Sequence, residues 1–355
     1  MAWLGEAPGA GLSGDPGEAE HTAFSKNQPI PLSRRCLGTD IRPSTDYRVA
    51  RRRIDVEIAP NMFAGVRWGR LVLGVSLTAV LALSVHAVML QWLHVPYPDA
   101  SVFDSALPDW LNDAVMLCAA VWLYRCLRAR ATAQPVALRF FVLFGLLFCL
   151  NETLRGAWMN GYCVTRSWSE RGGVGLISCV HGVVNFVLVA GFAAGIGRLR
   201  HKGWQCAAVI VATSLLAFLV SPSLTAMDAV IRDEVSRWVS LDLWCKLPYG
   251  MEVLIPAYLT FLEPVFASFV CFALVRRHLP GGLFSQAASF ALLLLALKRQ
   301  LLTSFLYAAF APGPVLTALA SMGQFSLEAA ALGLLTALSW RYARADLPSR
   351  TSAWW

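Results

Sequence analysis

Eight polar side chains stand inside long apolar stretches of this sequence, where they are costly to bury. An ionisable group at such a position costs about 3 kcal/mol on insertion scales unless it faces a partner or water, so it marks a functional site. Arginine binds anionic groups and a buried glutamate can exchange a proton, so the set predicts a site for ligand binding and proton coupling. The eight residues are Glu152, Arg155, His181, Asn185, Glu263, Arg299, Gln324 and Glu328.

The spacing of these residues indicates which of them share a helical face. Glu152 and Arg155 are three residues apart, and His181 and Asn185 are four apart, so each pair would lie on one face of a helix. Glu263 is followed directly by a proline. A proline at this depth would kink the helix and free backbone carbonyls for binding.

The polar residues near Arg299 predict a second charged face. A helical wheel puts Lys298 nearly opposite this face, which comprises Arg299, Gln300, Thr303, Ser304 and Tyr307. We expect Glu263 or Glu328 to be the partner of Arg299. Two interpretations stay open. Either the charged groups form ion pairs that only hold the helices in register, or they line one shared chamber that binds a ligand.

The composition requires that these residues be positioned by membrane helices. Of the 355 residues, 57% are hydrophobic and 15% are charged, and the mean hydropathy is +0.55. An ordinary soluble domain has about 25% charged residues, so this composition excludes a wholly soluble protein. The net charge of +8 is spread over segments that flank apolar runs. That distribution is typical of membrane orientation and argues against a nucleic-acid partner.

The sequence predicts an all-α integral membrane protein with a bundle of eight transmembrane helices. A helix needs roughly 20 apolar residues to cross a bilayer. The domain at 69–341 contains eight such segments, at about 70–94, 109–127, 138–159, 173–197, 203–221, 251–275, 283–310 and 315–340.

Charged loops predict the orientation of the segments. Arg and Lys cluster in the connections after the second, fourth, sixth and eighth segments, whereas the alternate connections are poor in basic residues or balanced by acids. Because positive loops stay in the cytoplasm, we expect both termini there. Arg far outnumbers Lys, which favours a bacterial source, and the predicted location is the bacterial inner membrane.

Three further elements lie outside the predicted spans. The composition of residues 1–68 predicts a flexible, disordered cytoplasmic tail. Residues 342–355 are expected to form a short cytoplasmic tail. An alternative for the N-terminus is that translation begins at Met62. Apolar residues at helical spacing predict an external amphipathic helix at about 226–241. It would lie on the outer membrane boundary or pack on the loops.

Two cysteines fall in external loops of this topology. Cys163 lies in loop 160–172 and Cys245 in loop 222–250. Because the outer side would be oxidising, a disulfide between these two residues is one outcome that we consider.

The segment from Asn151 to Gly156, followed by the segment from His181 to Asn185, resembles the CAAX-type glutamic intramembrane proteases. These proteins carry EExxxR on one helix and FxxxH and HxxxN on later helices. The sequence departs from that pattern, because Asn151 replaces the first Glu, the spacing from Glu to Arg is one residue short, and Ile177 replaces the Phe. The resemblance implies an enzyme in which Glu152 activates water while His181 and Asn185 stabilise an oxyanion.

The leading expectation is a multi-pass transporter or flippase for a polar or anionic small molecule or lipid headgroup. Arg155 and Arg299 would bind the anion, and Glu263 or Glu152 would carry the proton. The alternatives are an intramembrane enzyme, either a glutamic-type protease or a lipid-modifying transferase, and a non-catalytic sensor or assembly factor. We expect no cofactor and no metal, and membrane lipids as partners. The sequence leaves the substrate and the oligomeric state open.

Overall fold

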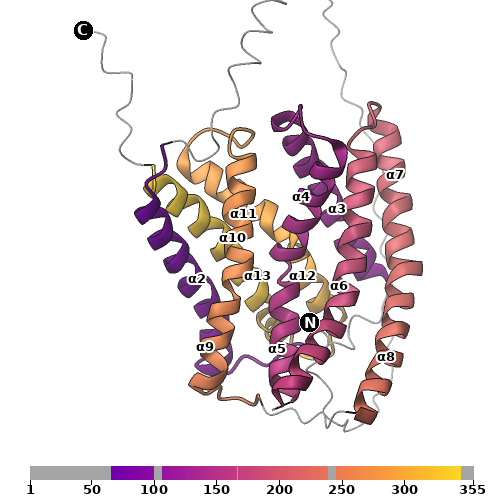
Figure 1. The fold of residues 1–355 in the computed structure, drawn as a ribbon, viewed down its shortest axis with the longest axis vertical. Coiled ribbons are helices and arrows are strands. Elements are labelled where there is room, and N and C mark those ends of the chain that lie inside the picture. Colours follow the sequence, from indigo (N-terminus) through magenta and orange to yellow (C-terminus); the bar gives the residue numbers. More distant parts are fainter. Residues whose placement is uncertain (1–64, 100–105, 166, 239–244, 345–355) are drawn as a thin grey trace, which may run out of the picture. The chain divides into compact units, whose positions relative to one another are not determined.

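The computed structural model describes residues 65–99, 106–165, 167–238 and 245–344, which belong to one compact unit. Residues 1–64 of the predicted N-terminal tail and most of the C-terminal tail lie outside these ranges. Within the described ranges, the regular structure is helical (Figure 1). The helices are α2 (Trp68–Gln91), α3 (Ala106–Arg130), α4 (Val136–Leu150), α5 (Thr153–Val164), α6 (Trp168–Ile196), α7 (Lys202–Leu215), the π-helix η2 (Leu216–Val220), α8 (Ser221–Trp238), α9 (Met251–Thr260), α10 (Leu262–Val275), α11 (Leu283–Leu297), α12 (Thr303–Phe310) and α13 (Val315–Tyr342).

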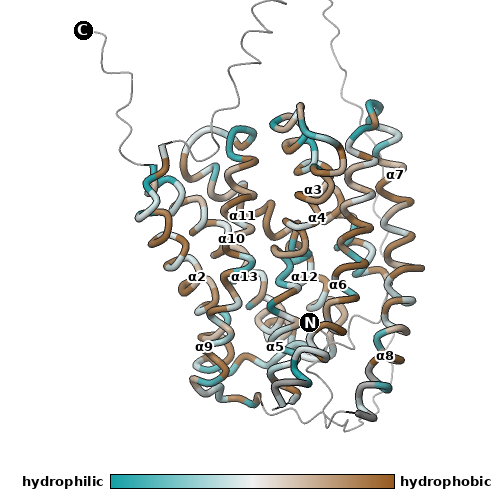
Figure 2. The backbone as a smooth tube through the Cα atoms, in the orientation of Figure 1, coloured by the Kyte–Doolittle hydropathy of each residue, from teal (hydrophilic) through white to brown (hydrophobic). Residues whose placement is uncertain are grey.

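The protein is a multi-pass helical membrane protein, with five to six candidate spans by helix length and composition. Five helical segments qualify alone: Trp68–Gln91, Glu170–Ile196, Lys202–Ile231, Met251–Val275 and Val315–Tyr342. A sixth forms if α4 and α5, which are bent by 41°, count as one span. The sequence-predicted segments 109–127 and 283–310 do not reach this standard, since α3 carries Asp109 and Asp113 among its residues and α11 has only 15 residues. Figure 2 shows hydrophobic residues along the helices and hydrophilic ones at the ends of α7 and α8.

Interhelical packing depends on small residues at close approaches. α13 packs against α2, α11 and α12, while α6 packs against α3, α4 and α5. A side chain at Gly333 of α13 would place its Cβ 2.6 Å from the Cα of Ala291 in α11, and one at Gly74 of α2 would place it 2.7 Å from the Cβ of Ser339. Small residues that let backbones approach drive helix association in lipid. α10 crosses near α4, α13, α2 and α3, and carries buried residues along its whole length.

The bundle has two distinct ends. At the upper end in Figure 1, here called the basic end, α3, α6, α10 and α13 finish and α4, α7 and α11 begin. At the other end, here called the disulfide end, α5 finishes and α9 begins. Cys163 and Cys245 form a disulfide there, and their Cα atoms are 5.1 Å apart. This bridge ties the end of α5 to the segment that leads into α9.

The region 202–238 differs from the sequence expectation. The sequence separates a span at 203–221 from an amphipathic helix at about 226–241, whose residues 239–241 lie outside the described ranges. In the structure, α7, η2 and α8 follow one another without a loop. The wider π-turn directly precedes Pro222, the second residue of α8. A proline removes one backbone donor, and a π-turn accommodates the altered hydrogen-bond pattern without ending the helix.

Candidate functional site

The third predicted span is broken at Asn151 and Glu152, between α4 and α5. Glu152 has a left-handed backbone with φ 57°. Side chains at the break donate to nearby backbone carbonyls, since a non-helical backbone inside a membrane needs such partners. Asn151 Nδ2 donates to the carbonyl oxygens of Leu147 at 2.9 Å and Leu297 at 3.1 Å, and Thr153 Oγ1 donates to that of Phe148 at 2.9 Å.

The seventh predicted span is broken in the same manner between α11 and α12. The residue in the left-handed conformation is Arg299, with φ 59°. Thr303 Oγ1 donates to the carbonyl oxygen of Arg299, and Ser326 Oγ of α13 donates to that of Gln300 at 2.9 Å. The helical wheel drawn through Lys298 and Tyr307 therefore does not apply, because the helix ends at Leu297.

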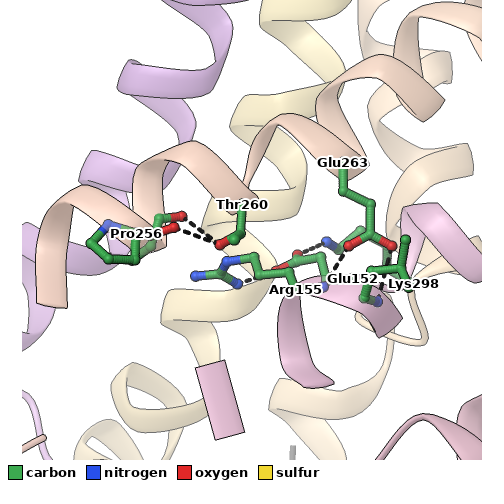
Figure 3. Close-up of polar contacts among 8 residues, drawn as sticks. Glu152, Arg155, Pro256, Thr260, Glu263 and Lys298 are labelled. Carbon is green, nitrogen blue, oxygen red and sulfur yellow. Dashed lines mark hydrogen bonds and ion pairs between the residues drawn. The ribbon is translucent and has the colours of Figure 1, made fainter. Parts of the chain in front are cut away.

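The two breaks meet at a buried cluster of charges centred on Glu152 (Figure 3). Glu152 forms ion pairs with Arg155 of α5 and with Lys298 at the second break, and its side chain is only 3% exposed. Glu328 of α13 is also buried.

Glu263 closes one side of the cluster by binding the start of α5 (Figure 3). Its two carboxylate oxygens accept the backbone N–H groups of Leu154 at 3.1 Å and Arg155 at 2.6 Å. These amides have no partner inside their own helix, and the positive end of the helix dipole favours an anion there. Glu263 lies in the first turn of α10, where Pro264 follows it. The break at Phe261 is stabilised by Thr260 Oγ1, which donates to the Pro256 carbonyl at 2.8 Å.

Arg299 belongs to a second charged group, on α3. Its Nη2 lies 2.8 Å from Asp109 Oδ1, and its Nε lies 3.2 Å from Asp113 Oδ1. The expectation that Glu263 or Glu328 is its partner is therefore wrong. The left-handed turn at Arg299 takes the side chain off the helical face from which that partner was inferred. Asn112, between the two aspartates, accepts a hydrogen bond from Thr303 at 3.2 Å.

Among the described residues, the remaining predicted site residues form no hydrogen bond or ion pair with the Glu152 cluster. His181 Nδ1 is 2.6 Å from Asp228 Oδ2 of α8, and Asn185 is half-buried one turn further along α6. Gln324 is fully buried and donates from Nε2 to the Ser321 carbonyl at 2.7 Å. Across the described part of the chain, no hydrogen bond or ion pair joins His181 or Asn185 to Glu152. The arrangement that the protease resemblance implies is therefore not assembled.

Sequence reasoning missed several residues that face the site. Asp109 and Asp113 are four residues apart in a predicted span, a signal that could have identified them. His86 of α2 stacks near Phe325 with ring centroids 4.8 Å apart, and Tyr97, in the loop after α2, contacts the same ring edge-on at 5.7 Å. Burial, reinforced by the nearby Tyr249, raises the pKa of Tyr97 to about 12, so its phenol stays protonated at neutral pH.

Metal binding has no ready donor set in this arrangement. Among the residues that the structure describes, no group of three or more His, Cys, Asp or Glu side chains is placed to hold a metal ion. Glu152 is instead paired with Arg155 and Lys298, and Asp109 is paired with Arg299. Carboxyl groups can carry a proton, and Arg, Lys and the start of a helix can hold an anion.

Comparison with known proteins finds no matching family model, no matching curated protein and no matching solved structure. Any function for the chain is therefore argued from the geometry of this site.

Proposed function

We propose that the chain is a transporter or flippase for a small anionic molecule or a lipid headgroup. One observation carries this proposal: two discontinuous helices meet at their breaks, and the breaks are joined by the Glu152–Lys298 ion pair. Secondary transporters form substrate and ion sites from such half-helices near the bilayer midplane. A purely structural ion pair would not require either helix to break, and each break carries a left-handed residue that is not glycine.

We propose eight crossings, with both termini in the cytoplasm of a bacterial cell. Two further segments would join the six candidates. α3 has 25 residues, about 37 Å of helix, and its two aspartates are paired with Arg299 rather than facing lipid. α11 and α12 would together form one broken span, as α4 and α5 do. The alternation of basic loops supports this topology.

Anion binding would compete with Glu263 for the start of α5. The carboxylate of Glu263 already occupies the position at Leu154 and Arg155 that a substrate carboxylate or phosphate would take. Protonation of Glu263 would weaken its hold on these amides and admit the substrate. Arg155 and Arg299 would supply cationic contacts, and Glu152 would be a second proton carrier.

Proton-coupled flux into vesicles tests the proposal. Proteoliposomes loaded with a pH-sensitive dye would receive succinate, inorganic phosphate or glycerol 3-phosphate from outside. We expect at least one of these anions to acidify the lumen, and Glu263→Gln to abolish that response. The matched control is Glu252→Gln, which removes an exposed acid from α9 and should leave the flux unchanged.

The enzyme and sensor alternatives predict different outcomes. Cleavage of a peptide or lipid in detergent, without flux of any anion, would favour an intramembrane enzyme. A stable co-purifying protein, with neither flux nor product, would favour an assembly factor. The separation of His181 from Glu152 in the structure gives the enzyme alternative less support than the broken helices give transport.

A further inference from the structure

A cavity of about 600 Å³ opens at the basic end of the bundle, near the start of α4, whereas Glu152 lies just after the end of that helix. It lies where α3 ends, α4 begins, α6 ends and α7 begins. Two connections that are far apart in sequence converge on it. Six cationic side chains line it: Arg125, Arg128, Arg139, Arg198, Arg200 and Lys202.

The cations of this cavity have no acidic partners. No Asp or Glu belongs to its lining. Within the described residues, none of the six forms an ion pair with an acidic side chain. The contacts they do make are to backbone carbonyls: Arg128 Nη1 donates to Gly197 at 3.4 Å, and Arg139 Nη2 donates to Gln134 at 2.8 Å. Crowded like charges repel one another, so an anion in the cavity would relieve the repulsion.

The start of α7 adds backbone donors to the same cavity. Its N-cap residue, His201, makes no side-chain capping bond, and the first-turn residues Lys202 and Gln205 belong to the lining. The first N–H groups of a helix lack intrahelical partners and favour negative charge. Together with the six cations, they form a concave site in which every formal charge of the described lining is positive.

Basic residues elsewhere at this end are arranged differently. Arg276 and Arg344 stack on the ring of Trp340 at 5.6 and 5.8 Å from its centroid, and Arg70 stacks on Tyr342 at 5.2 Å. These guanidinium groups cover aromatic surface and do not belong to the lining of the cavity between α3, α4, α6 and α7. The presence of basic residues at this end of the bundle is therefore not sufficient to explain the cavity between α3, α4, α6 and α7.

Apolar surface borders the cavity and indicates the kind of anion. Trp204 in the first turn of α7 is 71% exposed, and Leu199 in the cavity wall is 39% exposed. Val136 and Leu138, at the start of α4, are also exposed. An exposed Trp at the end of a span is typical of the membrane–water interface. A ligand with an anionic head and acyl chains would match both surfaces.

We propose that this cavity binds the phosphate headgroup of an anionic phospholipid from the adjacent leaflet. The phosphate would lie among Arg139, Arg198 and Arg200, and the acyl chains would run along the exposed faces of α4 and α7. Basic pockets between transmembrane helices are suited to such headgroups. The proposal is independent of transport through the Glu152 cluster.

Lipid retention by the purified full chain tests the proposal. Native mass spectrometry would compare phosphatidic acid and cardiolipin with zwitterionic phosphatidylcholine. The test variant is Arg198→Gln/Arg200→Gln, and the control is Arg277→Gln/Arg341→Gln, which removes two equally exposed arginines from the same end. We expect the test variant to bind the anionic lipids about thirtyfold more weakly, and the control to change binding less than twofold.

Two outcomes would overturn the proposal. Equal losses in both double variants would show diffuse attraction to the basic end and no site. Inorganic phosphate or glycerol 3-phosphate that raises the unfolding temperature as much as the lipids do, and competes with them, would show a soluble phosphate ligand. If the double variant does not fold, Arg139→Gln tests the same proposal, because Arg139, near the start of α4, also lines the cavity.

Discussion

Glu152 and Lys298, which are 146 residues apart in the chain, form an ion pair that joins the breaks of two membrane helices. The breaks share a backbone feature, since Glu152 and Arg299 are both left-handed. The packing around them is also parallel: α4 contacts α10, and α11 contacts α3. The sets α3–α6 and α10–α13 are therefore arranged alike. In each set the second helix is followed by a break, and this helix contacts the first helix of the other set.

The first prediction concerns the energetic role of this ion pair. Lys298→Met leaves Glu152 with one cationic partner fewer in a buried site. We expect it to lower the free energy of unfolding by about 3–5 kcal/mol, since removing one member of a buried pair leaves an uncompensated charge. The double change Glu152→Gln/Lys298→Met should recover part of that loss, because neutral replacement of both members is often tolerated, but Arg155 then loses its carboxylate partner as well.

Thermal unfolding in detergent, followed by intrinsic fluorescence, measures both variants. Lys246→Met is the control, because Lys246 is exposed in the loop before α9. It should change stability by less than about 0.5 kcal/mol. A double variant that is no more stable than Lys298→Met would contradict the ion-pair account.

A second prediction isolates the left-handed backbone at Arg299. Arg299→Asn and Arg299→Val both remove the contacts with Asp109 and Asp113, so they differ mainly in the backbone conformation they tolerate. Asparagine adopts a positive φ readily, whereas a β-branched residue does not. We expect the valine variant to be less stable by about 1–2 kcal/mol.

The same two substitutions at Arg341 provide the reference, because that exposed residue lies in the regular helix α13. There the two variants should differ by only a few tenths of a kcal/mol. Equal stabilities of the two Arg299 variants would show that the break can relax into a continuous helix.

Much of the helical content could be predicted from apolar segment length alone. The segments at 70–94 and 315–340 correspond closely to α2 and α13, because each is uninterrupted and predominantly apolar. Composition also identified the chain as a multi-pass membrane protein. The charged groups inside the segments located the cluster at Glu152 because a buried charge has few alternatives to pairing.

The breaks themselves could not be predicted by periodicity. A helical wheel assumes a continuous helix, and it therefore put Lys298 opposite the polar face and assigned Arg299 the wrong partner. No glycine or proline marks either break; the left-handed residues are a glutamate and an arginine, which rarely adopt that conformation. Tertiary contacts, such as Asn151 with the Leu297 carbonyl, stabilise a geometry that local propensity opposes.

The third prediction concerns the disulfide between Cys163 and Cys245. The bridge closes a loop of 82 residues, so we expect Cys163→Ser/Cys245→Ser to lower stability by about 2–4 kcal/mol. Dithiothreitol should lower the unfolding temperature of the wild-type protein by a similar amount and leave the double variant unchanged. The control Cys118→Ser/Cys206→Ser removes two exposed free cysteines and should keep the response to dithiothreitol. Labelling of Cys163 by a maleimide without prior reduction would argue against the bridge.

The last prediction tests the eight proposed crossings with reporter insertions in a bacterial host. Insertions after Arg130, Lys202 and Arg277 should report the cytoplasm, because each follows a cluster of positive charge. Insertions after Pro98, Lys246 and Gly313 should report the outside. The site after Lys246 lies beyond α8, which continues the helix from α7 as far as Trp238.

Two comparisons are decisive for the segments that do not qualify as spans alone. If α3 does not cross, Pro98 and Arg130 will report the same side. If α11 and α12 form a re-entrant loop, Gly281 and Gly313 will both report the cytoplasm, and the C-terminus will then lie outside. Opposite signals in both comparisons are the outcome we expect, because the charges of α3 are paired within the bundle and the break at Arg299 lies against the break at Glu152.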